Sequence, residues 1–135
     1  MNGNANLNAN NLTPQNVVDW RNKLGINADL LWQNPNPTSA QNSQNITVPD
    51  LSQYKILISV FKNYYSYGGE DMRFHKIKIG SQPYSVVLGD TGGVISSRCF
   101  TITNATTINI GVGRKSTTQN NGQCIILEFY GIKEF

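Results

Sequence analysis

From residue 45 onward, apolar and polar residues alternate in short runs that turn-forming residues interrupt. The strand-like runs are Asn45–Val48, Tyr54–Lys62, Met72–Ile79, Tyr84–Leu88, Val94–Thr103, Thr106–Val112 and Cys124–Ile132. About seven or eight short strands at this spacing, with no helical pattern between them, are typical of an antiparallel sandwich rather than a parallel α/β sheet. The sequence therefore predicts an all-β fold, an antiparallel and jelly-roll-like β-sandwich over residues 45–135.

The core of this sandwich is expected to come from the apolar positions of the runs. The run Tyr54–Lys62 is apolar on both faces, as a central strand would be. The predicted core includes Ile56, Ile58, Val60, Ile77, Val86, Ile108, Ile126 and Phe129.

Three segments of different character precede the strands. Residues 1–11 are almost entirely Asn, Ala, Gly and Leu, which predicts a flexible segment because little apolar surface is available to bury. Residues 12–26 predict a short helix. Residues 27–44 are rich in Pro and Asn, which favour an extended path, and predict a linker.

The predicted helix has a clear start and one apolar stripe. Thr13 is a suitable N-cap and Pro14 suits the first helical position. Val17, Trp20 and Leu24 recur at i, i+3 and i+7 on one face. A lone helix of about twelve residues is marginal in water, so the stripe must pack against the β-domain or against sister chains. We expect the second arrangement, in a homotrimer about a common axis.

Composition excludes several classes of protein. Only 14% of the residues are charged, and the net charge of +3 is scattered along the chain, whereas nucleic-acid binding requires a clustered basic stripe. No apolar run approaches the roughly 20 residues of a membrane-spanning helix. The polar start, Met1 to Asn11, lacks the pattern of a signal peptide. We therefore expect neither nucleic acid nor membrane insertion.

The residues that usually carry catalysis are sparse. The one histidine, His75, stands between cations in its strand and is expected to face solvent. Glu70 and Asp71 are adjacent but follow a Gly-Gly turn, where acidic residues are common. Cys99 and Cys124 lack metal-ligand spacing and are expected to be reduced and buried, with a disulfide between them as the alternative. The sequence predicts no enzyme, no metal and no cofactor.

One loop combines aromatic area with hydrogen-bonding groups. Saccharide sites stack sugar rings on aromatic faces and bind hydroxyls with amides and carboxylates. The loop at residues 63–71 offers both kinds of group, and the candidate ligand-binding residues are Tyr64, Tyr65, Tyr67, Glu70 and Asp71. The alternative is that these tyrosines cap the sandwich or fill a subunit interface. A second long loop, at residues 113–122, has no aromatic residue.

The stretch from Leu31 to Lys62 carries a recognisable pattern. Its matching residues are Leu31, Trp32, Asn34, Pro35, Pro37, Thr38, Ser39, Gln44, Ile46, Thr47, Val48, Leu51, Ser52, Tyr54 and the run Ile56–Phe61. The stretch resembles a pattern in tail and minor structural proteins of phages and prophages of Gram-positive bacteria. The segment Arg98–Thr103 and the ending Glu128–Lys133 resemble the same proteins, whereas residues 63–93 are the least typical part.

The resemblance implies a virion protein, made in the bacterial cytoplasm and released by lysis. Its implied role is a tail-fibre tip or baseplate domain that attaches to host cell-wall saccharide. Two alternatives remain open: a capsid decoration or head-fibre protein that binds no receptor, and a polysaccharide depolymerase. The single histidine weighs against the depolymerase, and the resemblance carries over no catalytic residue.

Overall fold

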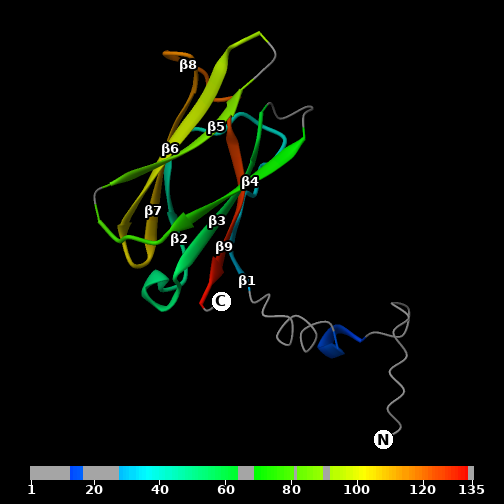
Figure 1. Cartoon of the computed structure of the whole chain (residues 1–135), viewed down its shortest axis with the longest axis vertical. Helices are drawn as coiled ribbons and strands as arrows, with labels where there is room; N and C mark the ends of the chain where they lie inside the picture. Colours follow the sequence, from blue (N-terminus) through cyan, green and yellow to red (C-terminus); the bar gives the residue numbers. More distant parts are fainter. Residues whose placement is uncertain (1–12, 17–27, 64–68, 81, 90–91, 134–135) are drawn as a thin grey trace, which may run out of the picture.

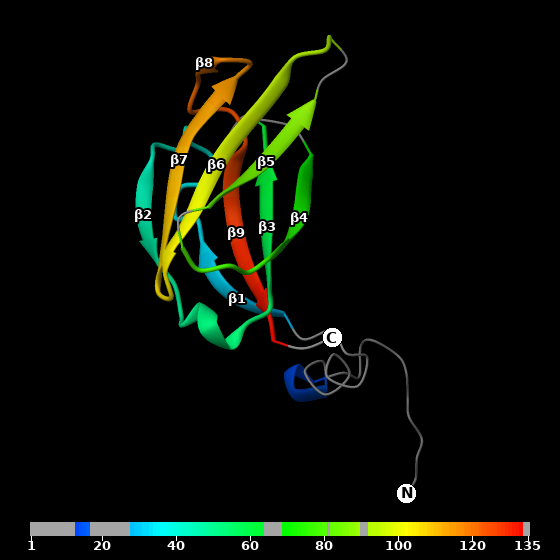
Figure 2. The same ribbon diagram turned by 60° about the vertical axis from the view of Figure 1, so that its left-hand side comes forward.

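The computed structural model describes residues 13–16, 28–63, 69–80, 82–89 and 92–133. Within these ranges two antiparallel sheets face each other, which confirms the predicted all-β sandwich (Figures 1 and 2). The strands are β1 (Ala28–Gln33), β2 (Gln44–Thr47), β3 (Ile56–Lys62), β4 (Glu70–Lys76), β5 (Pro83–Gly89), β6 (Ile95–Asn104), β7 (Thr107–Lys115), β8 (Thr118–Gln119) and β9 (Ile125–Ile132), with a 3-10 turn η2 (Leu51–Gln53) before β3. The first sheet has the order β1-β9-β3-β4. The second has the order β2-β7-β6-β5, with β8 paired to β7.

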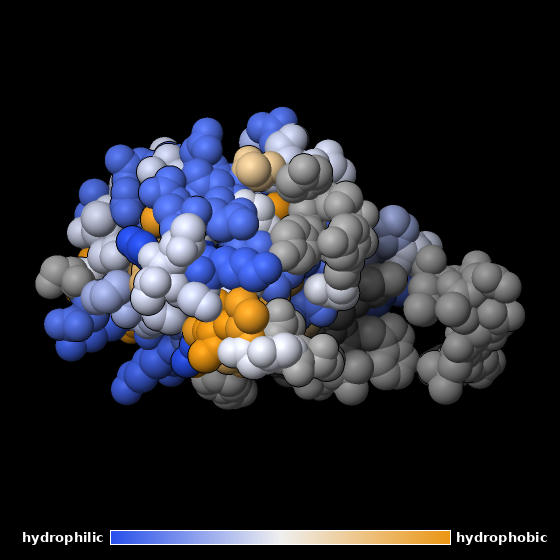
Figure 3. Space-filling model, turned by 90° about the horizontal axis from the view of Figure 1, so that it is seen from above, coloured by the Kyte–Doolittle hydropathy of each residue, from blue (hydrophilic) through white to orange (hydrophobic). Residues whose placement is uncertain are grey.

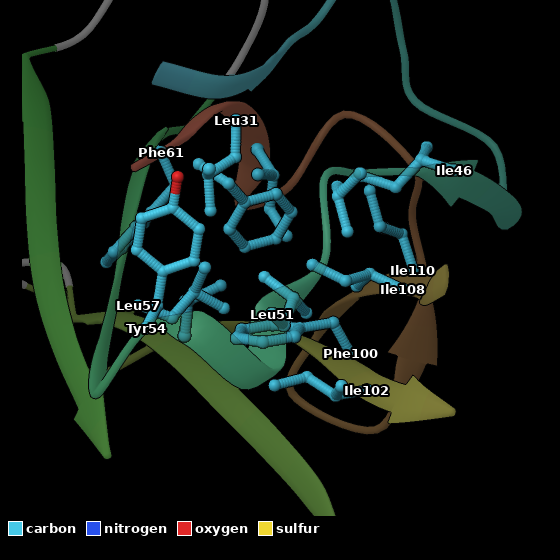
Figure 4. Packing of buried hydrophobic residues seen from close by; sticks show 14 of the residues in the cluster. Leu31, Ile46, Leu51, Tyr54, Leu57, Phe61, Phe100, Ile102, Ile108 and Ile110 are labelled. Carbon is cyan, nitrogen blue, oxygen red and sulfur yellow. The ribbon is translucent and has the colours of Figure 1, made fainter. Parts of the chain in front are cut away.

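The core lies between the two sheets and takes large side chains from both. Figure 4 shows Leu57 and Phe61 of the first sheet pointing toward Phe100 and the isoleucines of the second. Leu51 of η2 closes the interior from one side and is fully buried. Of the predicted core residues, Val86, Ile108, Ile126 and Phe129 are confirmed as fully buried, while Ile56 and Ile77 are half-buried.

The central strand β3 turns a different face to the interior than the prediction assumed. Leu57 and Phe61 belong to the core between the sheets, with Ser59 buried between them. Ile58 and Val60 are also buried, but on the outer face, where Val60 packs with Ile125 and Leu127 in a second apolar cluster. Both faces of β3 are apolar, so hydrophobic alternation could not decide between them.

The stretch predicted as a linker, residues 27–44, is part of the sandwich. It contains β1, which pairs with β9 along the edge of the first sheet. Beyond β1, the side-chain amide of Asn34 donates to the carbonyl of Ile126 (3.0 Å). The side-chain amide of Gln41 bonds both backbone groups of Ile126. It donates to the carbonyl (3.1 Å) and accepts from the N–H (2.8 Å). The sheet therefore begins before the predicted boundary at residue 45.

The first turn of the predicted helix is present. Residues 14–16 are helical, and the hydroxyl of Thr13 accepts from the N–H of Asn16 (3.1 Å) while the Asn16 side chain accepts from the N–H of Thr13 (3.0 Å). These reciprocal bonds are those of an N-terminal capping box. The remaining residues of the predicted helix, with Val17, Trp20 and Leu24, and the predicted flexible segment 1–11 lie outside the described residues. No helix in the described ranges is long and apolar enough to span a membrane.

A buried arginine of β6 bonds β7 in its own sheet, the segment before β2 and the turn before β9. Arg98 of β6 is only 1% exposed, and burial lowers its pKa to about 10, so the guanidinium stays charged at neutral pH. Its donors reach five backbone carbonyls, those of Cys124 (2.9 Å), Gln41 (2.9 Å), Gly111 (2.7 Å), Asn121 (3.1 Å) and Gln123 (3.0 Å). Because every N–H of the guanidinium points at a carbonyl, its burial leaves no donor unsatisfied.

Replacing this guanidinium tests how much it contributes to stability. Arg98→Met should lower the free energy of unfolding by at least about 3 kcal/mol, because several buried carbonyls lose their donor at once. Arg114→Met, at the exposed end of β7, is the matched control and should change stability by no more than about 0.5 kcal/mol. Urea unfolding followed by tryptophan fluorescence measures both. Equal stability of the two variants would contradict the assigned role of Arg98.

Gly113 lies where no side chain fits. A Cβ at this position would come within 2.4 Å of the carbonyl oxygen of Asn120, 2.6 Å of that of Gln123 and 2.7 Å of the Arg98 guanidinium. Gly113→Ala should therefore destabilise the fold by roughly 2 kcal/mol or more through overpacking. Gly89→Ala is the control, since a Cβ there meets nothing within 4 Å. Thermal unfolding of both variants checks this, and a neutral Gly113→Ala would refute it.

Candidate binding surface

The sandwich has two distinct ends. Figures 1 and 2 show that β1 begins and β9 ends at one end of the sandwich. Strands β3, β5 and β7 end, and β4, β6 and β8 begin, at the opposite end, which we call the loop end. Figure 3 looks onto the loop end and shows a mostly hydrophilic surface with one compact hydrophobic group. Surface loops on a rigid scaffold are the usual place for recognition residues, so a binding surface is expected at the loop end.

The β3–β4 connection is anchored inside the loop end at its first residue. The Asn63 side chain accepts from the N–H of Cys124 (2.9 Å) and donates to the hydroxyl of Ser96 (3.2 Å). The Ser96 hydroxyl in turn donates to the side chain of Gln123. The Gln123 amide nitrogen is buried and has no hydrogen-bond partner among the described residues. Asn63 therefore fixes where the loop leaves the sheet rather than offering its amide to a ligand.

The residues predicted to bind ligand are placed only in part. Tyr64, Tyr65 and Tyr67 lie outside the described residues. Glu70 and Asp71 open β4 and are exposed, and the Asp71 carboxylate accepts from the N–H of Met72 (2.8 Å). Whether the tyrosines and the two carboxylates act together stays a prediction.

Glu70 lines a cavity that sequence reasoning did not find. The cavity has a volume of about 220 Å³ and is lined by Gln33, Asn34, Pro37, Lys62, Glu70, Leu127 and Glu128. A second cavity of about 220 Å³ shares Asn34 and is lined otherwise by Pro35, Asn36, Ala40, Gln41, Asn42 and Gln44. Amides and carboxylates dominate both linings. Such groups donate to and accept from hydroxyls, which is the chemistry that a saccharide requires.

The second cavity is built from the stretch predicted as a linker. The signal was present in the sequence: amide residues are dense between Gln33 and Gln44. The Pro and Asn content of the same stretch predicted only an extended linker. Lys62 and Glu70 flank the tyrosine-bearing connection, and both line the first cavity, so the connection starts and ends beside it.

The other long loop uses its polar side chains internally. Asn120 accepts from the N–H of Gly122 (3.0 Å), and Asn121 accepts from the N–H of Gly113 (3.2 Å) and donates to Asn42 (3.1 Å). Arg114 donates to the carbonyl of Thr117 (3.4 Å). These bonds shape the turn and leave fewer groups for a ligand than the first cavity offers.

His75 is buried, which corrects the prediction that it faces solvent. It is 5% exposed, its Nε2 lies 2.8 Å from the hydroxyl of Ser59, and its ring meets Tyr84 and Phe100 edge-on. Burial, and secondarily the charge of Arg73, lower its pKa to about 4. The prediction failed because it used neighbouring charges in sequence, whereas alternation along β4 turns His75 inward. Its surroundings are those of a core residue rather than of an exposed general base.

The cysteines divide between surface and core. Cys124 is buried as expected, and burial raises its pKa to about 11, so its thiol is protonated at neutral pH. Cys99 is exposed, which corrects the expectation that both are buried, and the two are not joined. No group of three or more His, Cys, Asp or Glu within the described ranges is placed to hold a metal ion.

The fold and the surface described above define an antiparallel β-sandwich with polar cavities near its loop end. Comparison with protein-family models, curated proteins and solved structures found no match to this chain. Its function must therefore be argued from its own residues and from the resemblance noted in the sequence.

Buried His75 makes stability depend on pH. The folded pKa of about 4 lies below the ordinary 6.5, so between these values only the unfolded chain binds the proton. Stability is therefore complete above pH 6.5 and falls as the pH drops toward 4, by about 2 kcal/mol between pH 7.5 and 5. Urea unfolding at the two pH values measures this. In His75→Gln the difference should largely vanish, since the chain holds no other histidine; an unchanged difference would contradict the assignment.

Proposed function

We propose that this chain is a non-enzymatic attachment module of a phage virion, a fibre-tip or baseplate domain that binds cell-wall saccharide of the host. One observation carries the proposal. Strand β1 begins and β9 ends at one end of the sandwich, while the tyrosine-bearing connection starts and ends beside a polar cavity toward the other. A module that recognises its ligand through one end of a rigid sandwich has this arrangement.

The residues that carry the resemblance support a shared architecture. Asn34 bonds β9, Arg98 bonds five carbonyls, and Tyr54 is buried with its hydroxyl donating to Asp29 (2.8 Å). These residues stabilise the sandwich, whereas the stretch 63–93 is the least typical part of the pattern. Receptor specificity is therefore assigned to residues that differ from the pattern, chiefly the connection around Glu70.

Saccharide binding at one such surface is weak, so several copies would act together. Linked sites gain roughly 10²–10⁴ in avidity over one site. The homotrimer expected from Val17, Trp20 and Leu24 would supply this gain. Those residues lie outside the described ranges, and the trimer stays part of the proposal.

Binding to purified cell walls tests the proposal against its rivals. The purified chain is mixed with walls from a panel of Gram-positive bacteria, and both the bound protein and the length of the released polymer are measured. Saturable binding without shortening is the expected result. Shortening of the polymer would establish a depolymerase. Failure to bind any wall, with antibody label on phage heads in electron microscopy, would establish the capsid alternative.

The tyrosines provide the sharpest variant. Tyr65→Ala combined with Tyr67→Ala should weaken wall binding roughly tenfold or more, because truncated aromatic contacts commonly cost over 1 kcal/mol each. Lys115→Ala, an exposed change at the end of β7, is the control and should bind as the parent does. Circular dichroism confirms that both variants fold. A double variant that folds and still binds fully would remove the tyrosines from the site.

A further inference from the structure

Among the described residues, the edge strand β4 pairs with another strand on one side only, and it carries exposed apolar residues. It is the last strand of the first sheet and pairs there with β3 (Figure 2). Met72 is 58% exposed and Phe74 56% exposed, among the most exposed large apolar residues of the described chain. An open strand edge with apolar side chains is a template for pairing with another strand.

The backbone groups that face this free edge belong to the even-numbered residues of β4. In the register that pairs Ile56 with Lys76, the N–H of Ile77 donates to the carbonyl of Lys55 (3.0 Å), so odd-numbered residues bond β3. The Met72 N–H is consistent with this assignment, because it donates to the Asp71 carboxylate rather than to β3. Hydrogen bonding alternates along an antiparallel strand. Residues 70, 72, 74 and 76 therefore turn their N–H and C=O groups to the free edge, where the Lys76 carbonyl already accepts from the Tyr84 hydroxyl (2.7 Å).

The side chains of these same four residues share the outer face of the sheet, opposite to buried His75. In chain order they are acidic, apolar, apolar and basic: Glu70, Met72, Phe74 and Lys76. An antiparallel second copy of β4 presents the same four residues in the opposite order, so that acidic residues face basic ones and apolar residues face apolar ones. When a second copy of β4 lies antiparallel and centred on Arg73, each Glu70 meets a Lys76 and each Met72 meets a Phe74. Every residue pair then occurs twice, as a two-fold axis requires.

We propose that β4 pairs with β4 of a second copy of this chain in that register, joining the two four-stranded sheets into one. The outward backbone groups fit the pairing, because the facing residues are all even-numbered. Met72 and Phe74 can exchange both hydrogen bonds, and the Lys76 N–H can donate to the Glu70 carbonyl, while the Lys76 carbonyl keeps its bond to the Tyr84 hydroxyl. The Met72 N–H would leave the exposed Asp71 carboxylate for the carbonyl of Phe74 in the second copy. Arg73 lies on the axis, where its guanidinium is held toward β5 by the Ser85 carbonyl (2.6 Å).

The charges on β4 are arranged so that they favour pairing of two copies rather than protect the edge from it. Charged residues on an edge strand often block association. On β4, however, the acidic and basic positions have opposite signs and lie at equal distances from the centre. In the antiparallel register they attract, and they do so at two places in each pair.

Charge reversal tests the pairing. Light scattering over a concentration series should give the parent a mass of two chains, each of 15.0 kDa. Glu70→Lys alone, and Lys76→Glu alone, each place like charges opposite one another twice and should weaken pairing about tenfold or more. An equimolar mixture of the two single variants should pair again, as should the double variant, because opposite charges then meet. Lys115→Glu, on β7, is the control and should pair like the parent.

Each contrary outcome overturns the pairing. The pairing is overturned if the parent stays at the mass of one chain at all concentrations. It is also overturned if the single variants keep the mass of the parent. Single variants that dissociate without rescue on mixing rule out this register. If chains also form the proposed trimer, the parent reaches six chains and the single variants three. A parent of three chains that the single variants leave unchanged would support the trimer and reject the β4 pairing.

Discussion

The buried guanidinium of Arg98 is the interaction on which the loop end depends. Five carbonyls, from the segment before β2, from β7 and from the turn before β9, point into one place that no strand pairing reaches. Without a donor at their centre these carbonyls would be buried and unsatisfied. One planar group with five N–H donors satisfies all of them, which a lysine with three donors could not do. Gly113 lies close to this guanidinium, and the site requires a glycine there because a Cβ would displace the guanidinium.

This anchor also explains why an Asn- and Pro-rich stretch forms a defined surface. Gln41 gives its carbonyl to Arg98 while its side-chain amide bonds both polar groups of Ile126. Asn34 bonds the same strand from the other end of the stretch. Held at these two points, the segment between them lines cavities instead of crossing solvent freely. The polar surface at the loop end is therefore a consequence of interior hydrogen bonds rather than of local propensity.

The strands were predictable because short apolar runs between turn residues carry their own signal, and that part of the fold is confirmed. Four features were not predictable, each for a physical reason. The strand β1 borders a Pro-rich segment, and its place in the sheet depends on β9, almost a hundred residues later. The inward face of β3 was ambiguous because both faces are apolar. The buried positions of Arg98 and His75 depend on partners, such as Ser59 for His75, that only the folded chain brings together. The cavity containing Glu70 was missed because Glu128 and Gln33 come from β9 and β1, far apart in sequence.

Attachment through the loop end and pairing through β4 impose different geometries on neighbouring copies. Antiparallel pairing of β4 turns the two loop ends in opposite directions, so the two members of one pair cannot both face the same cell surface. The proposed homotrimer would instead keep its three loop ends on one side, so attachment and β4 pairing make different demands on the arrangement of copies. Glu70 takes part in both surfaces, so a second copy would bring Lys76 next to the cavity and couple ligand binding to pairing.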